Sequence, residues 1–319
     1  MSGDLYAARG LTLALAWFMT CSVASTAAVV AVAPRLLARR DRRSPALWLG
    51  LRLGPAILSL AFVAFVFLPS YWRYEPRSDA GEGFDLTLTV LAAGAAAVIA
   101  LAGLRAADAL WSARRRTRAW WRASRPLEIG LATIPAFAVD VQAPIMALVG
   151  VLRPRLLITR GVLVALTADE LRAAVAHELG HWRALDNLKR LAMRTAPDLL
   201  FVTSTAAAIE ARWASEAEHA ADRQAGADEA SRCALASALV KIARLTPPRT
   251  PLAQPISTLV DGGEIASRVE HLLSHPAPGP AVSRTRLAAG VSMLVAAAAY
   301  APLLRLVHEA TEILVRTLP

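Results

Sequence analysis

Long apolar runs alternate with basic segments along this chain of 319 residues. Four runs approach or exceed the roughly 20 apolar residues that a helix needs to cross the hydrocarbon core of a bilayer. They cover residues 10–34, 53–72, 86–104 and 287–304. The last run is the shortest and is rich in alanine, so a buried helix of the polar region is the alternative there. The pattern predicts an α-helical membrane protein with about four transmembrane helices.

The more polar region between the third and fourth runs predicts a separate α+β domain. Its first part contains short apolar runs, rich in β-branched residues and separated by prolines, which are typical of strands in a small sheet. These runs are residues 127–132, 136–141, 145–151 and 156–159. We therefore expect three membrane helices in residues 1–105, a soluble domain in 106–286, and a fourth membrane helix with a short tail in 287–319.

Two further segments leave alternatives open. Residues 110–125 carry three tryptophans among arginines. They fit an amphipathic helix lying on the membrane surface, or a helix whose tryptophans pack in a core. Residues 199–209 are apolar but too short to span a membrane. They predict a buried helix or one that dips into the membrane surface.

A helix with a strong start signal follows the predicted strands. Thr167 is a suitable N-cap residue and Glu170 stands three positions later, as in a capping box. This helix runs through His177-Glu178-Leu179-Gly180-His181, an H-E-x-x-H pattern. Residues four apart share a helix face, so both imidazoles can reach one metal ion, and Glu178 can take a proton from a water molecule there. The pattern predicts a zinc (Zn²⁺) site with Glu178 as the catalytic base.

A catalytic zinc site with two histidines needs a third protein ligand. Glu218 is our candidate, because Asp222 lies four residues later on the same predicted helix face and can orient a ligating histidine. Glu216 and His219 are competing candidates. Glu216 has no carboxylate four residues later, and His219 points about 100° away from Glu218 around the helix.

The arginines predict the orientation. Residues 35–52 contain six arginines and one acid, and residues 105–125 contain seven arginines and one acid, which accounts for the net charge of +10. Both stretches flank apolar runs, where positive residues mark the cytoplasmic side and contact anionic lipids. We therefore expect a cytoplasmic domain in a multi-pass protein, with the lipid bilayer and not nucleic acid as its partner.

These residues together resemble the membrane gluzincins, which include the CAAX prenyl protease and HtpX type and the BlaR/MecR type. The resemblance covers roughly residues 139–222. It is closest to the BlaR/MecR type, because a strand pair bounded by prolines precedes the pattern T-x-x-E-L-x-x-x-x-x-H-E-L-x-H. The given sequence ends without the extracellular ligand-binding domain of the sensing transducers, so we do not expect this chain to sense beta-lactams by itself.

The resemblance implies a zincin-like metallopeptidase fold and a role for each matching residue. His177, His181 and Glu218 would bind zinc, Glu178 would be the general base, and Asp222 and Asp186 would support the ligands. For Asp186, an ion pair with Arg190 on the helix surface is the alternative.

We therefore expect a zinc metalloendopeptidase of a bacterial plasma membrane that hydrolyses a cytoplasmic or membrane-associated protein, for example a regulatory repressor. A quality-control protease of the HtpX type and a non-catalytic signalling protein are the alternatives. His271, His275 or an arginine would supply the donor to the oxyanion. The sequence does not choose among them, and it does not predict the oligomeric state.

Overall fold

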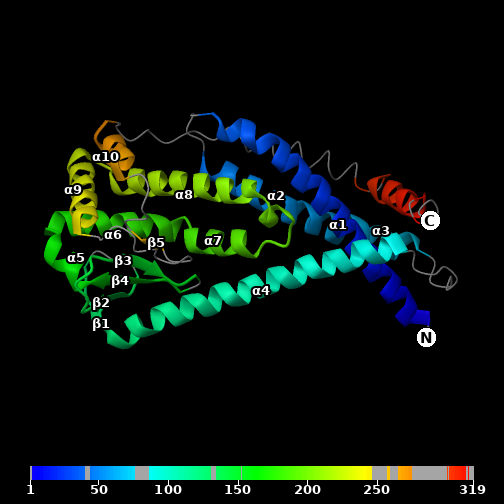
Figure 1. Cartoon of the computed structure of the whole chain (residues 1–319), viewed down its shortest axis with the longest axis horizontal. Helices are drawn as coiled ribbons and strands as arrows, with labels where there is room; N and C mark the ends of the chain where they lie inside the picture. The colour runs from blue at the N-terminus through cyan, green and yellow to red at the C-terminus, as the bar shows by residue number, and fades with distance from the viewer. Residues whose placement is uncertain are drawn as a thin grey trace.

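Long helices occupy one end of the molecule, and a small sheet covered by shorter helices occupies the other (Figure 1). The computed structural model describes residues 2–39, 44–75, 86–130, 134–151, 153–245, 257–258, 265–274, 300, 302–313 and 315.

Within the described residues, three helical stretches are long and apolar enough to cross a membrane: Asp4–Leu37, Pro45–Tyr74 and Leu86–Ala123. The first lies in α1 (Ser2–Leu37) and the third is α4 (Leu86–Ala123). The second joins α2 (Pro45–Phe62), the π-helical η1 (Val63–Phe67) and α3 (Leu68–Tyr74) without a break.

These stretches contain the first three predicted membrane segments. The fourth, residues 287–304, lies mostly outside the described residues, so the count of four spans stays a prediction. The predicted domain boundaries also stay predictions.

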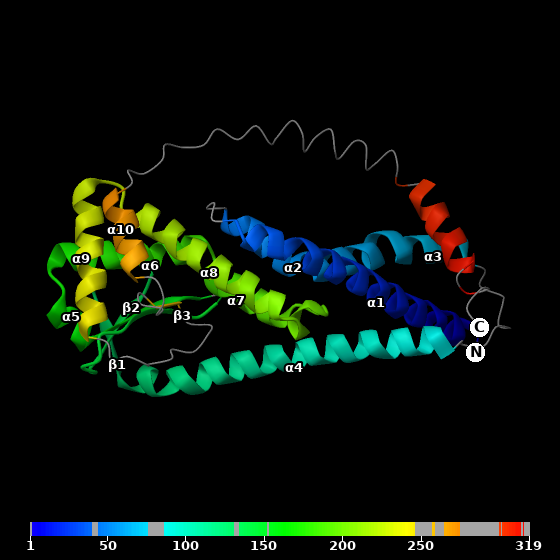
Figure 2. The same cartoon turned by 45° about the horizontal axis from the view of Figure 1, so that its top comes forward.

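The three long stretches pack against one another at the end that is remote from the sheet. Leu13 of α1, Phe67 of η1 and Leu88 of α4 belong to one buried cluster there. The helix of residues 302–313 joins them, because Ser70 Oγ donates a hydrogen bond of 2.7 Å to the carbonyl oxygen of Leu304. It therefore lies at the same end of the molecule as the start of α1 (Figure 2).

α4 extends well beyond the predicted third membrane segment. Residues 110–123 continue this helix and do not form a separate one. Trp120 and Trp121 pack against the buried cluster around Ala147 and Leu157 in the sheet, whereas Trp111 is 63% exposed. Of the two interpretations of residues 110–125, core packing holds for Trp120 and Trp121 and fails for Trp111.

The sheet has the strand order β1-β2-β4-β3-β5. β2 and β4 are parallel, and the other pairs are antiparallel. The strands are β1 (Ser124–Leu127), β2 (Ala136–Val139), β3 (Met146–Val149), β4 (Arg155–Thr159) and β5 (Ser257–Thr258).

Three of the four predicted strands are present. The first prediction, residues 127–132, is wrong for residues 128–130, because β1 starts earlier and ends at Leu127. β1 is an edge strand formed of mixed residues that continue directly from α4, so no apolar run marks it.

Helices cover the sheet and carry the polar cluster described below. They are α5 (Arg160–Ala165), α6 (Ala168–Arg183), α7 (Asp186–Thr195), the short 3₁₀ helix η2 (Leu200–Val202), α8 (Ser204–Ala225), α9 (Glu229–Leu245) and α10 (Ile265–Ser274). The main core lies between the sheet, α6 and α9, with Leu148, Leu156, Val175 and Leu239 among its buried members.

A buried network joins the long apolar helices to the helices beside the sheet. Arg52 of α2 is 1% exposed and forms an ion pair of 3.1 Å with the fully buried Asp198. It also donates hydrogen bonds to Glu210 (2.6 Å) and to the carbonyl oxygen of Met193 (2.6 Å). Arg105 of α4 donates to the carbonyl oxygen of Ala196. The turn between α7 and α8 is thus held by two of the long apolar helices.

The apolar residues 199–209 pack on this junction. Leu200 and Ile209 are fully buried with Trp48 of α2 and Trp213 of α8. Of the two interpretations of this segment, burial against protein therefore holds for these two residues.

The start of α6 is the predicted capping box. The Thr167 amide donates to Glu170 Oε2 at 2.8 Å, and the Glu170 amide donates to Thr167 Oγ1. Glu170 also accepts hydrogen bonds from Ser237 and Lys241 of α9. Burial alone would raise the pKa of Glu170, but these hydrogen bonds lower it to about 2.

Glu170→Gln should therefore destabilise the protein in a pH-dependent way. A carboxylate with a lowered pKa stabilises the fold above its ordinary value of 4.5 and loses that contribution as the pH falls toward about 2. Thermal unfolding in detergent should show a lower melting temperature for the variant at neutral pH, with the difference shrinking on acidification. Asp169→Asn is the control, because Asp169 is exposed and pairs with Arg172 on the same helix. A difference that grows on acidification would contradict the assignment.

Candidate metal centre

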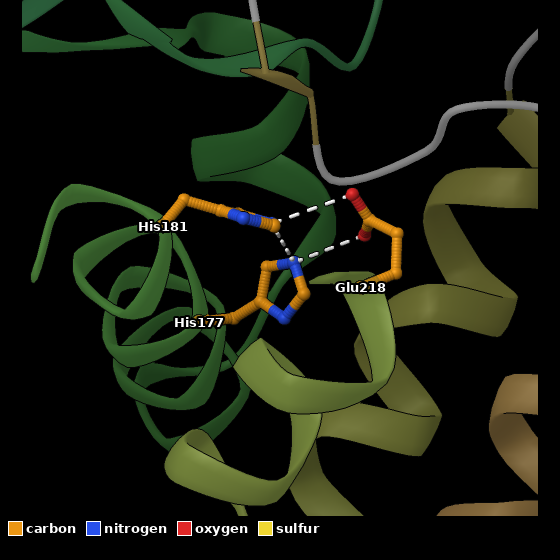
Figure 3. A group of neighbouring side chains, drawn as sticks. All are labelled: His177, His181 and Glu218. Carbon is orange, nitrogen blue, oxygen red and sulfur yellow. Dashed lines mark hydrogen bonds and ion pairs between the residues drawn. The ribbon is translucent and has the colours of Figure 1, made fainter. Parts of the chain in front are cut away.

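Three side chains from two helices converge between α6 and α8 (Figure 3). His177 and His181 lie one helical turn apart on α6 and are fully buried, and Glu218 comes from α8. The two Nε2 atoms are 3.2 Å apart, and each lies 3.4 Å from one carboxylate oxygen of Glu218. The structure therefore brings together the three predicted ligands.

These separations fit a tetrahedral metal ion. A zinc ion with nitrogen and oxygen ligands at about 2.0–2.1 Å places neighbouring ligand atoms about 3.3–3.4 Å apart. The observed separations of 3.2–3.4 Å match this value. No fourth side chain joins this group among the described residues, so the donor set leaves one tetrahedral position open.

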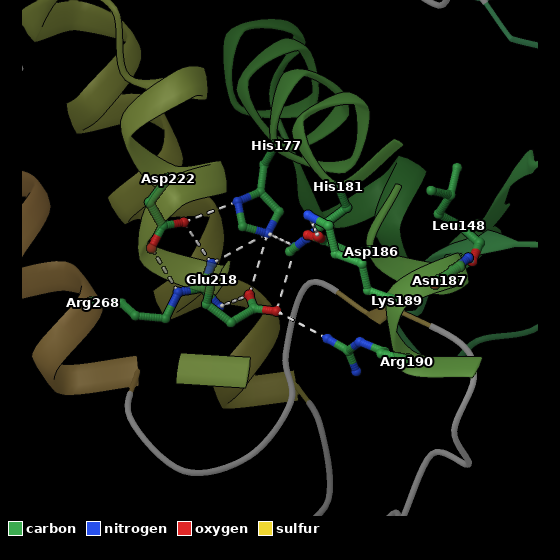
Figure 4. Close-up of polar contacts among 10 residues, drawn as sticks. All are labelled: Leu148, His177, His181, Asp186, Asn187, Lys189, Arg190, Glu218, Asp222 and Arg268. Carbon is green, nitrogen blue, oxygen red and sulfur yellow. Dashed lines mark hydrogen bonds and ion pairs between the residues drawn. The ribbon is translucent and has the colours of Figure 1, made fainter. Parts of the chain in front are cut away.

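Each histidine has a carboxylate at its other ring nitrogen (Figure 4). His177 Nδ1 lies 2.9 Å from Asp222 Oδ1, and His181 Nδ1 lies 2.8 Å from Asp186 Oδ2. A carboxylate at Nδ1 favours the tautomer with its proton there, which leaves the Nε2 lone pair for a metal. Asp222 and Asp186 thus occupy the supporting positions that the sequence predicted for them.

A sharp turn directs Asp186 toward His181. Leu185, between α6 and α7, adopts a left-handed conformation with φ 56°, which is unusual for a residue other than glycine. α6 ends before this residue, and α7 begins directly after it with Asp186. Lys189 Nζ lies 3.2 Å from Asp186 Oδ1. Arg190, the alternative partner of Asp186, lies 3.7 Å from Glu218 Oε1.

Small residues allow α6 and α8 to approach closely. A Cβ atom added at Gly180 would lie 3.3 Å from both Cα and Cβ of Ala221. Gly180 lies next to His181, and Ala221 lies between Glu218 and Asp222. The short contact between helix backbones thus sets the distance between the histidines and the carboxylate.

Glu178 is buried beside this cluster. Neither of its carboxylate oxygens makes a hydrogen bond to any part of the chain that the structure describes. Burial raises the pKa of Glu178 to about 7, and His181 and His177 partly oppose that shift. A buried carboxyl group with a pKa near neutrality is suited to accept a proton and to release it.

The cluster also favours positive charge at its centre. Burial would lower the pKa of His181, but Glu218 and Asp186 raise it to about 10. Burial would raise the pKa of Glu218, but His181, His177 and Arg268 hold it well below its ordinary value. The donor set thus has the electrostatic character of a cation site, which agrees with its geometry.

Arg268 is the residue at this site that the sequence analysis missed. It lies on α10, is 4% exposed and binds Asp222 with two hydrogen bonds of 2.8 and 2.6 Å. Its Nη1 atom lies 3.1 Å from Glu218 Oε2. Arg268 lies 46 residues after Asp222, and no local spacing connects the two. Only its position on a short amphipathic helix could have suggested a buried role.

The competing candidates lie outside the cluster. Glu216 pairs with Arg212 at 3.4 Å. The buried His219 packs its ring against that of His271, with centroids 5.4 Å apart. His275 falls outside the described residues, so its prediction as an oxyanion donor is not tested.

Comparison with known proteins agrees with this site. Residues 128–259, which contain the three converging side chains, match the family model of Peptidase family M48. Peptidases of that family are metalloproteases, so the match supports an M48 family metallopeptidase and a peptidase hydrolase. A search of curated proteins finds no match to the chain. The closer resemblance to the BlaR/MecR or HtpX type stays a prediction.

Enlarging Gly180 should weaken metal binding without unfolding α6. Gly180→Leu is expected to push α8 and Glu218 away and to lower zinc affinity by at least about tenfold, the scale at which loss of ligand support acts. Chelator competition would measure it. Arg183→Leu, an exposed substitution on the same helix, is the matched control. Equal zinc affinity in both variants would show that the close approach does not set the site.

His181→Ala tests the ligand set directly. Removing one of three protein ligands should reduce bound zinc to a small fraction of the wild-type content in elemental analysis of purified protein. His271→Ala, outside the cluster, should retain full zinc. Full zinc occupancy in His181→Ala would remove this residue from the ligand set.

Proposed function

We propose that this chain is an integral membrane zinc endopeptidase that hydrolyses peptide bonds of a cytoplasmic or membrane-associated protein. Glu178 carries the proposal: a buried carboxylate stands beside three converging ligands that leave one metal position open. A purely structural zinc site is closed by four protein ligands and needs no such base. The match to Peptidase family M48 gives independent support.

His177, His181 and Glu218 would hold the metal ion, with Asp222 and Asp186 fixing the two imidazoles. When bound, zinc supplies Lewis-acid chemistry that polarises a scissile carbonyl and acidifies a water molecule. Glu178 would take the proton of the attacking water and deliver it to the leaving amine. Arg268 would keep Asp222 ionised and oriented, because its guanidinium holds both oxygens of that carboxylate.

The membrane location rests on three long apolar helices and on the arginines that flank them. The basic segments 35–52 and 105–125 would face the cytoplasm by the positive-inside rule. The cluster would then lie on the cytoplasmic side, since Arg52 and Arg105 belong to these segments. Arg52 binds Glu210 of α8, and Arg105 binds the carbonyl oxygen of Ala196 in the turn before α8. A regulatory repressor is the substrate we propose by analogy with the BlaR/MecR type.

Glu178→Gln tests the catalytic proposal. The amide cannot accept the water proton, so cleavage should fall by about 10²–10⁴-fold, the usual contribution of a general base, while zinc content stays unchanged. Proteomic comparison of cells with wild-type protein and with this variant would identify stabilised substrates. Glu216→Gln is the matched control, since Glu216 is buried on α8 but pairs with Arg212.

Full proteolysis by the Glu178→Gln variant would refute the mechanism. Absence of any substrate difference between the two strains would instead favour a non-catalytic signalling protein. Accumulation of many misfolded membrane proteins in the variant strain would favour the quality-control alternative over a single regulatory substrate.

A further inference from the structure

A cavity of about 390 Å³ lies between the C-terminal half of α4 and the β3–β4 hairpin. We propose that this cavity binds the headgroup of an anionic phospholipid together with the first part of one acyl chain. The proposal rests on the proposed function only in placing the C-terminal half of α4 on the cytoplasmic side of the membrane.

The cavity has an apolar interior. Leu110 and Ala113 of α4 face Val149 and Val151 of the hairpin across it, and Trp121 also lines it. Its volume falls at the lower end of the roughly 300–1,000 Å³ typical of small-molecule pockets. It is therefore large enough for a glycerophosphate group and a few methylenes, but not for a whole lipid.

Three arginines contribute the charge: Arg114 from α4, and Arg153 and Arg155 from the hairpin. No acidic side chain lines the cavity among the described residues. The guanidinium of Arg155 lies over the rings of Trp121 and Phe137, at 5.5 and 5.6 Å from their centroids. Guanidinium groups bind phosphate oxygens through paired hydrogen bonds, so this site has the chemistry of a phosphate receptor with an apolar interior.

The position of the cavity favours a lipid as the source of that phosphate. Leu110 follows the predicted end of the third membrane segment by six residues, which corresponds to about 9 Å along a helix. Headgroup regions extend the roughly 30 Å hydrocarbon core to about 40–45 Å in total. The near wall of the cavity therefore lies within about 4 Å of the outer edge of the headgroup region. Long arginine side chains and tryptophans can span that gap to contact anionic lipids.

The hairpin that forms one wall is also attached to the metal centre. Asn187 Nδ2 donates a hydrogen bond of 3.0 Å to the carbonyl oxygen of Leu148 (Figure 4) and one of 2.9 Å to that of Gly150. Asn187 directly follows Asp186, which holds His181. Gly150 has φ +109°, and a Cβ there would lie 3.0 Å from the carbonyl oxygen of Arg153. A lipid in the cavity would thus stabilise the hairpin to which Asn187 is bonded. The residue before Asn187 is Asp186, which supports the proposed ligand His181.

Lipid binding to the purified full-length chain in detergent tests the proposal. Native mass spectrometry would compare short-chain phosphatidylglycerol with phosphatidylcholine of the same chain length, and inorganic phosphate would be tried as a competitor. We expect phosphatidylglycerol to bind at least about tenfold more tightly than phosphatidylcholine, because only the former carries net negative charge to the arginines. Phosphate alone should compete only weakly, since it lacks the apolar part.

Two variants and a matched control locate the site. Arg114→Gln/Arg153→Gln/Arg155→Gln should abolish the preference for phosphatidylglycerol, and Ala113→Trp should do the same by filling the cavity without changing the charge. Arg115→Gln/Arg118→Gln/Arg122→Gln removes the same charge from exposed positions of α4 outside the cavity. This control should keep the preference.

Equal binding of the two lipids would overturn the proposal. An equal loss of the preference for phosphatidylglycerol in the control triple variant would also overturn it, because it would indicate unspecific electrostatic attraction. Full competition by inorganic phosphate would identify a free anion as the ligand and would also overturn it. The same titration with Glu178→Gln separates this proposal from the peptidase proposal, because it reads lipid binding without proteolysis.

Discussion

The burial of charge between α6 and α8 is the constraint on which the rest of the structure depends. Glu178, Glu218 and Asp222 are removed from water there together with His177 and His181. Leaving one member of such a group uncompensated costs about 3–5 kcal/mol. The group is stable because Asp222 and Asp186 each contact an imidazole and a cationic side chain. The ligand atoms of His177, His181 and Glu218 can in addition share one cation. The turn at Leu185 places Asp186 beside His181, and the packing of α10 places Arg268 beside Asp222. Both contacts pair a buried carboxylate with a partner.

Close packing of small residues converts that charge arrangement into a defined geometry. Gly180 and Ala221 let two helices approach until their opposing side chains stand at metal-ligand separation. α9, in turn, is bonded to the start of α6 through Glu170. Glu170 thus fixes the start of α6, and the close contact at Gly180 fixes its last turns. Together these contacts determine the positions of His177 and His181.

Much of this site could be predicted from the sequence, because helical periodicity alone relates His177 to His181 and Glu218 to Asp222. The order and approximate position of three strands followed from prolines between apolar runs. The remaining features depend on tertiary contacts. Arg268 reaches Asp222 across a long sequence separation, and Leu185 adopts a conformation that its residue type does not signal. The continuation of α4 beyond the predicted span was missed because arginines interrupt its apolar character.

Hydropathy divides this chain into apolar helices and a polar region. The network around Arg52 crosses that boundary, so the two parts do not fold separately. The first turns of α8 bury Ile209 and Trp213 against α2, and Asp198 has its charge neutralised by an arginine from that helix. A fragment beginning after the third membrane segment would expose this apolar surface and leave Asp198 without that counterion. Residues 106–286 are therefore not an autonomous folding unit: their native state includes the contacts that Arg52 of α2 and Arg105 of α4 make with α8 and the turn before it. Expression of this region alone should yield aggregated protein.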